Sequence, residues 1–466
     1  MSNTTQTSAG KRIEALLDDK SFVEIGGLVT ARCTDFNMTA VDTPADGVIT
    51  GYGTINGSLV YVYSQDVSVL NGSMGEMHAK KIVNIYDMAM KMGAPIVGLL
   101  DCAGLRLQEA TDALNAFGEI YQRQADTSGV IPQINAIFGV CGGGLALMPA
   151  LADFTFMEEK NAKLFVNSPN ALDGNFEAKN DTASCAFQSE VAGLVDFTGD
   201  EVTVLNEIRN LLSVLPSNFE DEAVDECMDD LNRTCEGLNA AVADPAYILT
   251  TISDQNLFIE TKKNYATDMV TGFIKINGAT VGAVANKASE AGCVLTAEGC
   301  EKAAEFVQFC DAFSIPVLSL TNVKGYLATV ENEKRIAKAA AKLTYAFASA
   351  TVPKVNLLMG EAYGSAYVAM NSKAIGADVT YAWPDASIGM MDAALAAKIM
   401  YADKPDLINE KAAEYATLQD SVMSAAKRGY VDSIVEPADT RKYIAGAFEM
   451  LYSKKVDTVA KKHGTV

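Results

Sequence analysis

The sequence lacks the residues and segments that several classes of protein require. Only two of its 466 residues are histidine: His78, at the start of an expected helix, and His463, in the C-terminal tail. A Ser-His-Asp hydrolase would therefore have no suitable base. Apolar stretches are broken well before the roughly 18 residues of a membrane span, and no signal-like apolar segment opens the chain. We expect a cytoplasmic protein, unless it docks peripherally on a membrane complex.

Basic residues are also scarce. The chain has 37 Lys and Arg against 59 Asp and Glu, which gives a net charge of −22. A chain this acidic has no general attraction for nucleic acid phosphates or anionic lipid. We expect neither partner, and an anionic ligand would have to be bound by a few local cations and backbone amides.

The cysteines form no recognisable site. None of the nine belongs to a C-x-x-C pair or a Cys/His cluster, so we expect no metal and no disulfide framework. The apolar fraction of 49% against 21% charged is typical of a globular chain with a sizeable core. The length predicts roughly two to four domains.

What the sequence does contain is an internal repeat. Adding 221 to positions in the first half reaches their counterparts in the second: residues 49–57 overlay 270–278 with five identities in nine. The same offset pairs other residues: Lys81 with Lys302, Pro95 with Pro316, Gly104 with Gly325, Pro132 with Pro353 and Gly143 with Gly364. Two copies of one fold explain this register.

Each copy predicts the same order of elements. A hairpin around Asn-Gly is followed by a helix, a strand after proline, a second helix, and a second strand that enters a Gly-rich turn. Strands alternating with helices predict an α/β fold with a mostly parallel sheet. The ranges are 55–57 and 276–278 for the hairpins, 108–127 and 331–349 for the second helices, 171–268 for an acidic connector, and 404–427 and 440–453 for C-terminal helices.

The two Gly-rich turns are the candidate chemical feature. Where a buried strand meets a helix, the first amides have no acceptor within the helix and can bind an oxygen that carries negative charge. Gly143 and Gly144 suit this role in the first copy, and Ser365 and Ala366 take it in the second. Close strand–helix packing is the alternative reason for small residues here. A dinucleotide-binding fold is excluded, because residues 139–144, with the sequence GVCGGG, lack the G-x-G-x-x-G spacing.

Several segments carry a resemblance to a known family. They are residues 46–66, 72–82, 101–109, 215–218, 301–318, 340–354, 382–384 and 426–441. In these the chain resembles, over nearly its whole length, the carboxyltransferase subunits of biotin-dependent acyl-CoA carboxylases and decarboxylases. The resemblance implies a tandem crotonase-like (ClpP/crotonase) ββα-superhelix fold, with residues 1–240 on the acyl-CoA side and 241–466 on the biotin side. It also implies an active site shared between subunits of a homodimer or a hexamer.

The resemblance implies roles for individual residues. The amides of Gly143 and Gly144 stabilise the enolate of a short-chain acyl-CoA, of the methylmalonyl/propionyl or malonyl/acetyl type. Those of Ser365 and Ala366 stabilise the biotin anion. Further candidates for cofactor contacts are Lys80, Lys81 and Arg106, toward the phosphates of CoA, and Gly104, Gly325, Tyr326 and Gly364. The implied partners are a biotin carrier protein and either a biotin carboxylase or a membrane sodium-pump decarboxylase subunit.

The chain departs from the family pattern at four positions on the biotin side: Lys324, Glu361, Ser365 and Asp392. Two other functions therefore stay open. One is a crotonase-type hydratase, isomerase or hydrolase that works without biotin and uses Glu109 or Glu76 as acid or base. The other is a degenerate subunit that only scaffolds a complex. Acyl-chain specificity and reaction direction stay open too.

Overall fold

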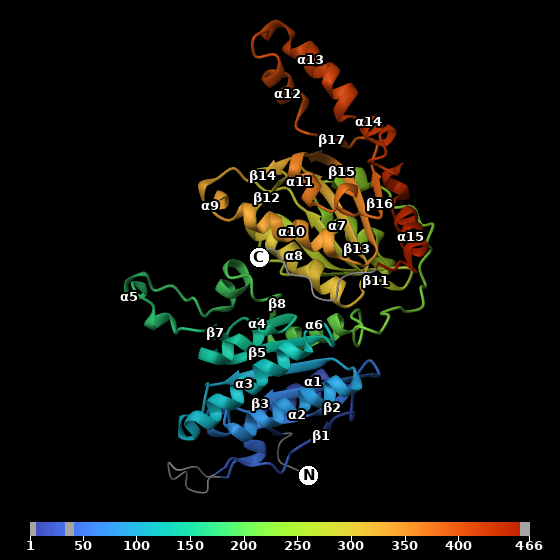
Figure 1. Cartoon of the computed structure of the whole chain (residues 1–466). Coiled ribbons are helices and arrows are strands. Elements are labelled where there is room, and N and C mark those ends of the chain that lie inside the picture. The colour runs from blue at the N-terminus through green and yellow to red at the C-terminus, as the bar shows by residue number, and fades with distance from the viewer. Residues whose placement is uncertain (1–5, 33–41, 457–466) are drawn as a thin grey trace. The chain divides into compact units, whose positions relative to one another are not determined.

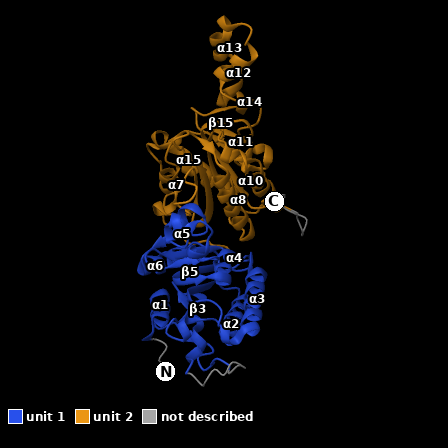
Figure 2. Cartoon of the chain, turned by 90° about the vertical axis from the view of Figure 1, so that its left-hand side faces the viewer, with its two compact units in different colours: residues 1–221 blue, residues 222–466 orange. Residues whose placement is uncertain are grey.

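The computed structural model describes residues 6–32 and 42–456. His463, which the sequence analysis named, and Cys33, one of the nine cysteines, lie outside these ranges. The chain divides into two compact units, Met1–Asp221 and Glu222–Val466 (Figure 2). Each is a mixed α/β unit built on a sheet in which most strand pairs are parallel. Among the described residues, no helix has the length and apolar character needed to cross a membrane.

Unit 1 contains the strand order β1-β2-β3-β4-β5-β6-β8, with β7 paired to β5. The first two pairings are antiparallel and the others parallel. Helices α2 and α3 lie on one face of this sheet and α1 and α6 on the other (Figure 2). The strands are β1 Val23–Glu24, β2 Val48–Ile55, β3 Ser58–Gln65, β4 Ile96–Cys102, β5 Gln133–Gly142, β6 Phe154–Glu158, β7 Lys163–Phe165 and β8 Phe197–Gly199; the helices are α1 Ser8–Leu16, α2 Glu76–Met92, α3 Ala110–Thr127, α4 Leu147–Leu151, α5 Asn175–Ala178 and α6 Glu201–Leu212.

Unit 2 contains the order β9-β10-β11-β13-β15-β16-β18, with β17 paired to β15 and a small β12-β14 pair. Helices α12 and α13 project from this unit as a helical arm (Figure 1). The strands are β9 Phe258–Thr261, β10 Met269–Ile276, β11 Ala279–Asn286, β12 Val294–Leu295, β13 Val317–Val323, β14 Gly325–Tyr326, β15 Lys354–Tyr363, β16 Val379–Ala382, β17 Ser387–Gly389 and β18 Ser433–Ile434; the helices are α7 Pro245–Ile252, α8 Ala297–Ala312, α9 Val330–Glu333, α10 Ile336–Ser349, α11 Gly364–Ala369, α12 Ala393–Met400, α13 Ile408–Tyr415, α14 Val422–Lys427 and α15 Thr440–Leu451.

The offset of 221 relates the central strands of the two units. Adding it to both ends of β2, β3, β4 and β5 gives the ends of β10, β11, β13 and β15. The hairpins turn at Asn56-Gly57 and Asn277-Gly278, where all four residues have positive φ, as a two-residue Asn-Gly loop requires. The expected hairpins, strands and parallel pairing are confirmed.

The repeated lysines have the same structural role in both units. The Lys81 ammonium donates to the carbonyls of Ala45 and Val48, where β2 begins. The Lys302 ammonium donates to the carbonyl of Met269, where β10 begins, at 2.7 Å. Both side chains are buried, so each satisfies carbonyl groups that the sheet leaves unpaired.

The boundary between the two units lies between Asp221 and Glu222, before the expected boundary at 240. Residues 222–240 pack on unit 2: Val224 pairs with Ala279, the Asp225 amide donates to the Gly278 carbonyl, and Cys235 and Leu238 are in the core. The expected acidic connector therefore divides between the units. The expected helix over 404–427 is interrupted by a π-helical turn over Ala416–Asp420, which separates α13 from α14.

Candidate active site

In unit 1, β5 ends at Gly142 and the chain turns into a short 3-10 helix, Gly143–Ala146. Gly143 has φ of 64°, a conformation that glycine adopts without steric cost. The first amides of this helix have no acceptor within it. Gly144 is exposed, and its carbonyl accepts a hydrogen bond from the Tyr121 hydroxyl of α3. This is a small surface turn that can present backbone donors to an oxygen.

In unit 2, β15 ends at Tyr363 and α11 begins at Gly364, whose φ is also 64°. Ser365 is exposed and Ala366 is buried. The strand register matches Gly143 with Gly364 and Gly144 with Ser365. The sequence analysis paired Gly143 with Gly364 but gave the anion-binding role in the second copy to Ser365 and Ala366, which correspond to Gly144 and Leu145. Each turn is best described by three successive amides, 143–145 and 364–366.

Tyr326 lies beside the unit 2 turn. Burial raises the pKa of the Tyr326 hydroxyl, and a hydrogen bond with the Ser365 side chain acts in the opposite direction. Gly325 precedes it in β14, and a side chain there would meet open space. The predicted residues Gly325, Tyr326, Gly364 and Ser365 are thus brought to one place.

Gly104 holds the loop after β4 against the start of α2. Its φ is 108°, which favours glycine. Its carbonyl accepts from the Met74 amide at 2.8 Å, and the Met74 carbonyl accepts from the Arg106 amide at 2.8 Å. Gly104 therefore shapes a loop, and the loop aligns residues 73–76 with residues 104–106.

The Arg106 side chain is directed into unit 1 and not toward a ligand. Its guanidinium donates to Asp46 and Glu109, each at 2.7 Å, and all three side chains are at most 1% exposed. Burial raises the pKa of Asp46, and the Arg106 charge opposes that rise. Because these carboxylates and the Ser73 carbonyl occupy its donors, Arg106 is unsuited to the expected contact with CoA phosphates.

The two neighbouring lysines differ. Burial lowers the pKa of Lys81 to about 8, and its ammonium is bound to carbonyls of unit 1, so Lys81 is also unsuited to phosphate contact. Lys80 has a side chain 48% exposed and an ion pair with Glu76 at 2.6 Å. Of the three expected cations, Lys80 is the one that a phosphate in solvent can reach.

The carboxylates proposed for a hydratase are already engaged. Glu109 accepts from Arg106 and from the Glu76 amide at 2.6 Å, and it is buried. Glu76 pairs with Lys80 and Arg32. Within residues 6–32 and 42–456, no cluster of three or more His, Cys, Asp or Glu side chains is arranged to hold a metal.

One of the four departures from the family pattern, all of which lie in unit 2, has a structural explanation. The Asp392 side chain accepts from the Leu395 amide at 3.1 Å and so caps the N-terminus of α12. Glu361 and Lys324 act in opposite directions on the pKa of the Cys293 thiol, which burial raises. Both charged groups therefore lie near Cys293.

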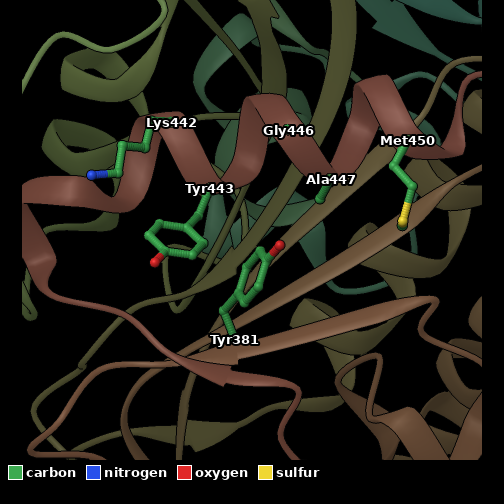
Figure 3. Close-up of a pocket in the computed structure, with 6 residues that line it drawn as sticks. All are labelled: Tyr381, Lys442, Tyr443, Gly446, Ala447 and Met450. Atoms are coloured by element: carbon green, nitrogen blue, oxygen red, sulfur yellow. The ribbon is translucent and has the colours of Figure 1, made fainter.

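A separate hollow of about 240 Å³ lies between β16 and α15 (Figure 3). Tyr381 and Tyr443 meet edge to face there, with ring centroids 5.6 Å apart. Its lysine, Lys442, is bound to Asp439 at 2.9 Å. The hollow presents no group suited to the chemistry expected of the two turns.

The Tyr121 hydroxyl and the Asp46–Arg106–Glu109 network were missed from the sequence. The repeat gives no signal for Tyr121, since its counterpart at 342 is a lysine. Segment 101–109 did mark Arg106 as part of a characteristic stretch, but nothing in it showed that the side chain turns inward.

Comparison with known proteins assigns the chain to a family. Residues 4–466 match the model of the carboxyl transferase domain. The methylmalonyl-CoA decarboxylase subunit alpha of Propionigenium modestum is 40% identical over 98% of this chain and 93% of that protein. The propionyl-CoA carboxylase beta chain of Roseobacter denitrificans is likewise 40% identical, with the same coverage.

A solved structure agrees with these relatives. The transcarboxylase 12S crystal structure, a hexamer with methylmalonyl-CoA and methylmalonic acid bound, matches with a TM-score of 0.93 and 37% identity, covering 98% of this chain and 92% of that one. The mixed α/β fold with two parallel-rich sheets is therefore shared with that enzyme. The chain belongs to the carboxyl transferase domain family.

Proposed function

We propose that this chain is the carboxyltransferase subunit that moves a carboxyl group between carboxybiotin on a carrier protein and a short-chain acyl-CoA. The names of its relatives support the methylmalonyl/propionyl pair as substrates. One observation carries the proposal: a strand, a glycine with φ of 64° and a helix start occur at equivalent positions in both units. The reaction needs two carbonyl oxygens to be stabilised as anions, and the chain offers two such turns.

We further propose that the two units arose by duplication of one crotonase-like domain. The constant offset of 221 through four central strands supports this, as does the shared role of Lys81 and Lys302. The same offset places the two turns at equivalent positions in their units. In this proposal one turn binds the acyl-CoA and the other binds the biotin.

On the acyl-CoA side, the amides of the 143–145 turn would receive the thioester oxygen. When the carboxyl group leaves methylmalonyl-CoA, the electron pair of the broken C–C bond moves onto that oxygen as an enolate. Each amide donor at such a position contributes about 2.7–4 kcal/mol of transition-state stabilisation. The Tyr121 hydroxyl, bound to the Gly144 carbonyl, would hold the turn in place.

On the biotin side, the amides of the 364–366 turn fit a ureido oxygen, since they are donors with small side chains at the start of a helix. When methylmalonyl-CoA loses its carboxyl group, the nitrogen of the carrier's biotin would take that group and give its proton to the α-carbon. In the carboxylation direction, both transfers would reverse. Tyr326, hydrogen-bonded to Ser365, would fix the position of that residue. The chain would therefore need a carrier protein and either a biotin carboxylase or a membrane sodium-pump decarboxylase subunit, and would work as a homodimer or hexamer.

The two rival functions are less well supported. Glu109 and Glu76 are held in ion pairs, so neither is available as the acid or base of a hydratase. A purely scaffolding role would not require the positive-φ glycine to be kept in both turns.

The test is incubation of the purified chain with methylmalonyl-CoA and free biotin. We expect propionyl-CoA to form only when biotin is present, with the carboxyl group recovered in equal amount as carboxybiotin plus the CO2 that carboxybiotin releases. Turnover without biotin that Glu109→Gln abolishes would indicate the hydratase class instead. Acyl-CoA binding with no turnover of methylmalonyl- or malonyl-CoA would indicate a scaffold.

A further inference from the structure

A second candidate site lies in unit 2, next to the start of the 364–366 turn. A pocket of about 850 Å³ is lined by Tyr363, the last residue of β15, and by residues of β17, the π-helical turn and α14. Because Tyr363 directly precedes Gly364, the pocket adjoins the turn that we assign to biotin. We refer to it as the acidic pocket.

The lining of the acidic pocket carries charge of one sign. Asp385, Asp392, Asp420 and Glu436 belong to it, and none of the described residues that line it is Lys, Arg or His. Asp385, Asp392 and Glu436 are exposed to solvent, whereas Asp420 is 4% exposed. The charge is therefore concentrated around one buried carboxylate.

Asp420 is the feature that points to a ligand. Both of its carboxylate oxygens are buried without a hydrogen-bond partner among the described residues. A buried carboxylate left unpaired is costly, and burial together with the charge of Asp392 raises the pKa of Asp420 to about 6. At neutral pH most of this group is ionised, and it lacks a counter-charge.

The backbone makes room for this carboxylate. A Cβ atom at Gly389 would lie 2.2 Å from Asp420 Oδ1, so a glycine at 389 is what allows the carboxylate to sit there. Tyr363 and Ser387, which also line the pocket, share a side-chain hydrogen bond.

The ligand class follows from charge and geometry. The described residues offer no set of three side chains spaced to coordinate a metal, and the pocket is large enough for a side-chain-sized group. We propose that the acidic pocket binds an organic cation, a primary ammonium or guanidinium group, with Asp420 as its anchor and Glu436 at its rim. This site does not depend on the carboxyltransferase function proposed above.

The test uses the full chain without acyl-CoA or biotin, at constant ionic strength. The probes are methylammonium and the capped amino acids N-acetyl-lysine, N-acetyl-arginine and N-acetyl-norleucine methylamide, with NaCl and KCl as metal-ion probes. Trp383, the one tryptophan of the sequence, precedes the pocket residue Pro384, so its fluorescence reports binding; calorimetry gives a second measurement.

We expect saturable binding of the cationic probes and none of the norleucine compound. Asp420→Asn should weaken binding at least tenfold and Glu436→Gln a few-fold, while Asp403→Asn, an exposed acid on the helical arm outside the pocket, should leave it unchanged. Methylammonium binding as tightly as the capped residues would indicate a free amine as the natural ligand. Tighter binding of a capped residue would indicate a Lys or Arg side chain of a docked protein.

Three results would overturn the proposal. They are equal binding of the norleucine compound, unchanged binding by a folded Asp420→Asn variant, and stronger binding of Na⁺ or K⁺ than of the organic cations. Absence of saturable binding to the folded wild-type chain would also overturn it and would make Asp420 a protonated structural acid.

Discussion

At the scale of single residues, the conformation of Gly143 matters more than the space around it. A Cβ atom there would meet nothing within 4 Å, so its effect would come from the φ of 64° alone. Left-handed backbone costs a residue with a side chain about 1–2 kcal/mol. Gly143→Ala should therefore shift the turn and its amides without a steric clash.

We expect Gly143→Ala to lower kcat for carboxyl transfer from methylmalonyl-CoA by about 10²-fold, the size of losing one oxyanion donor. Gly118→Ala is the matched control, since Gly118 is in α3, with open space and no positive φ. That variant should keep full activity. Equal activity of the two variants in a steady-state assay would show that the turn does not bind the reacting oxygen.

Arg106 illustrates what the sequence leaves undecided about a single side chain. The motif indicated a functional arginine, but the tertiary structure places it between Asp46 and Glu109. Whether an arginine turns inward depends on carboxylates brought from distant positions, and a local pattern does not show those.

We expect Arg106→Met to destabilise the chain by about 3–5 kcal/mol, because it leaves two buried carboxylates without their counter-charge. Lys80→Met, at an exposed position in the same segment, should change stability little. Urea unfolding followed by circular dichroism measures both. A stable Arg106→Met variant with a much higher KM for acyl-CoA would instead show that Arg106 contacts the CoA phosphates.

At the scale of elements, boundaries follow caps and local charge. Asp392 is one of the four departures from the family pattern, and the structure shows why an acid suits the position: it caps α12. The sequence contains the signal for this cap, an Asp directly before an Ala-rich stretch, but the sequence analysis treated Asp392 only as a departure from the family pattern.

Asp392→Ala should lower the stability of the helical arm by about 1 kcal/mol, whereas Asp392→Asn, which still accepts from an amide, should be nearly neutral. Hydrogen exchange of the amides in α12 measures the local effect. Equal protection in the two variants would show that charge, and not capping, is what Asp392 contributes.

At the scale of the whole molecule, the net charge of −22 opposes the approach of an anionic CoA ester. The electrostatic screening length falls from about 30 Å at 0.01 M salt to about 8 Å at 0.15 M. We expect KM for methylmalonyl-CoA to fall severalfold over that range, measured at fixed pH and with a non-binding salt. A rise in KM would show that local cations such as Lys80 dominate the encounter.

The sequence by itself determined the repeat, its offset of 221, the Asn-Gly hairpins, the alternation of strands and helices, and the family. Each of these features follows from the local spacing of residues or from residue types that favour one backbone conformation. Small residues marked both turns in the sequence as well, whereas the positive φ of Gly143 and Gly364 came only from the structure.

Only the tertiary structure decided which charged side chains are free. Arg106 and Lys81 are bound to groups of their own unit, and Asp392 is bound to the N-terminus of α12. Asp420 is the opposite case, a buried acid whose carboxylate oxygens have no hydrogen-bond partner among the residues that the structure describes. The reason is physical: pairing and burial depend on residues far apart in the chain, whose meeting no local pattern records.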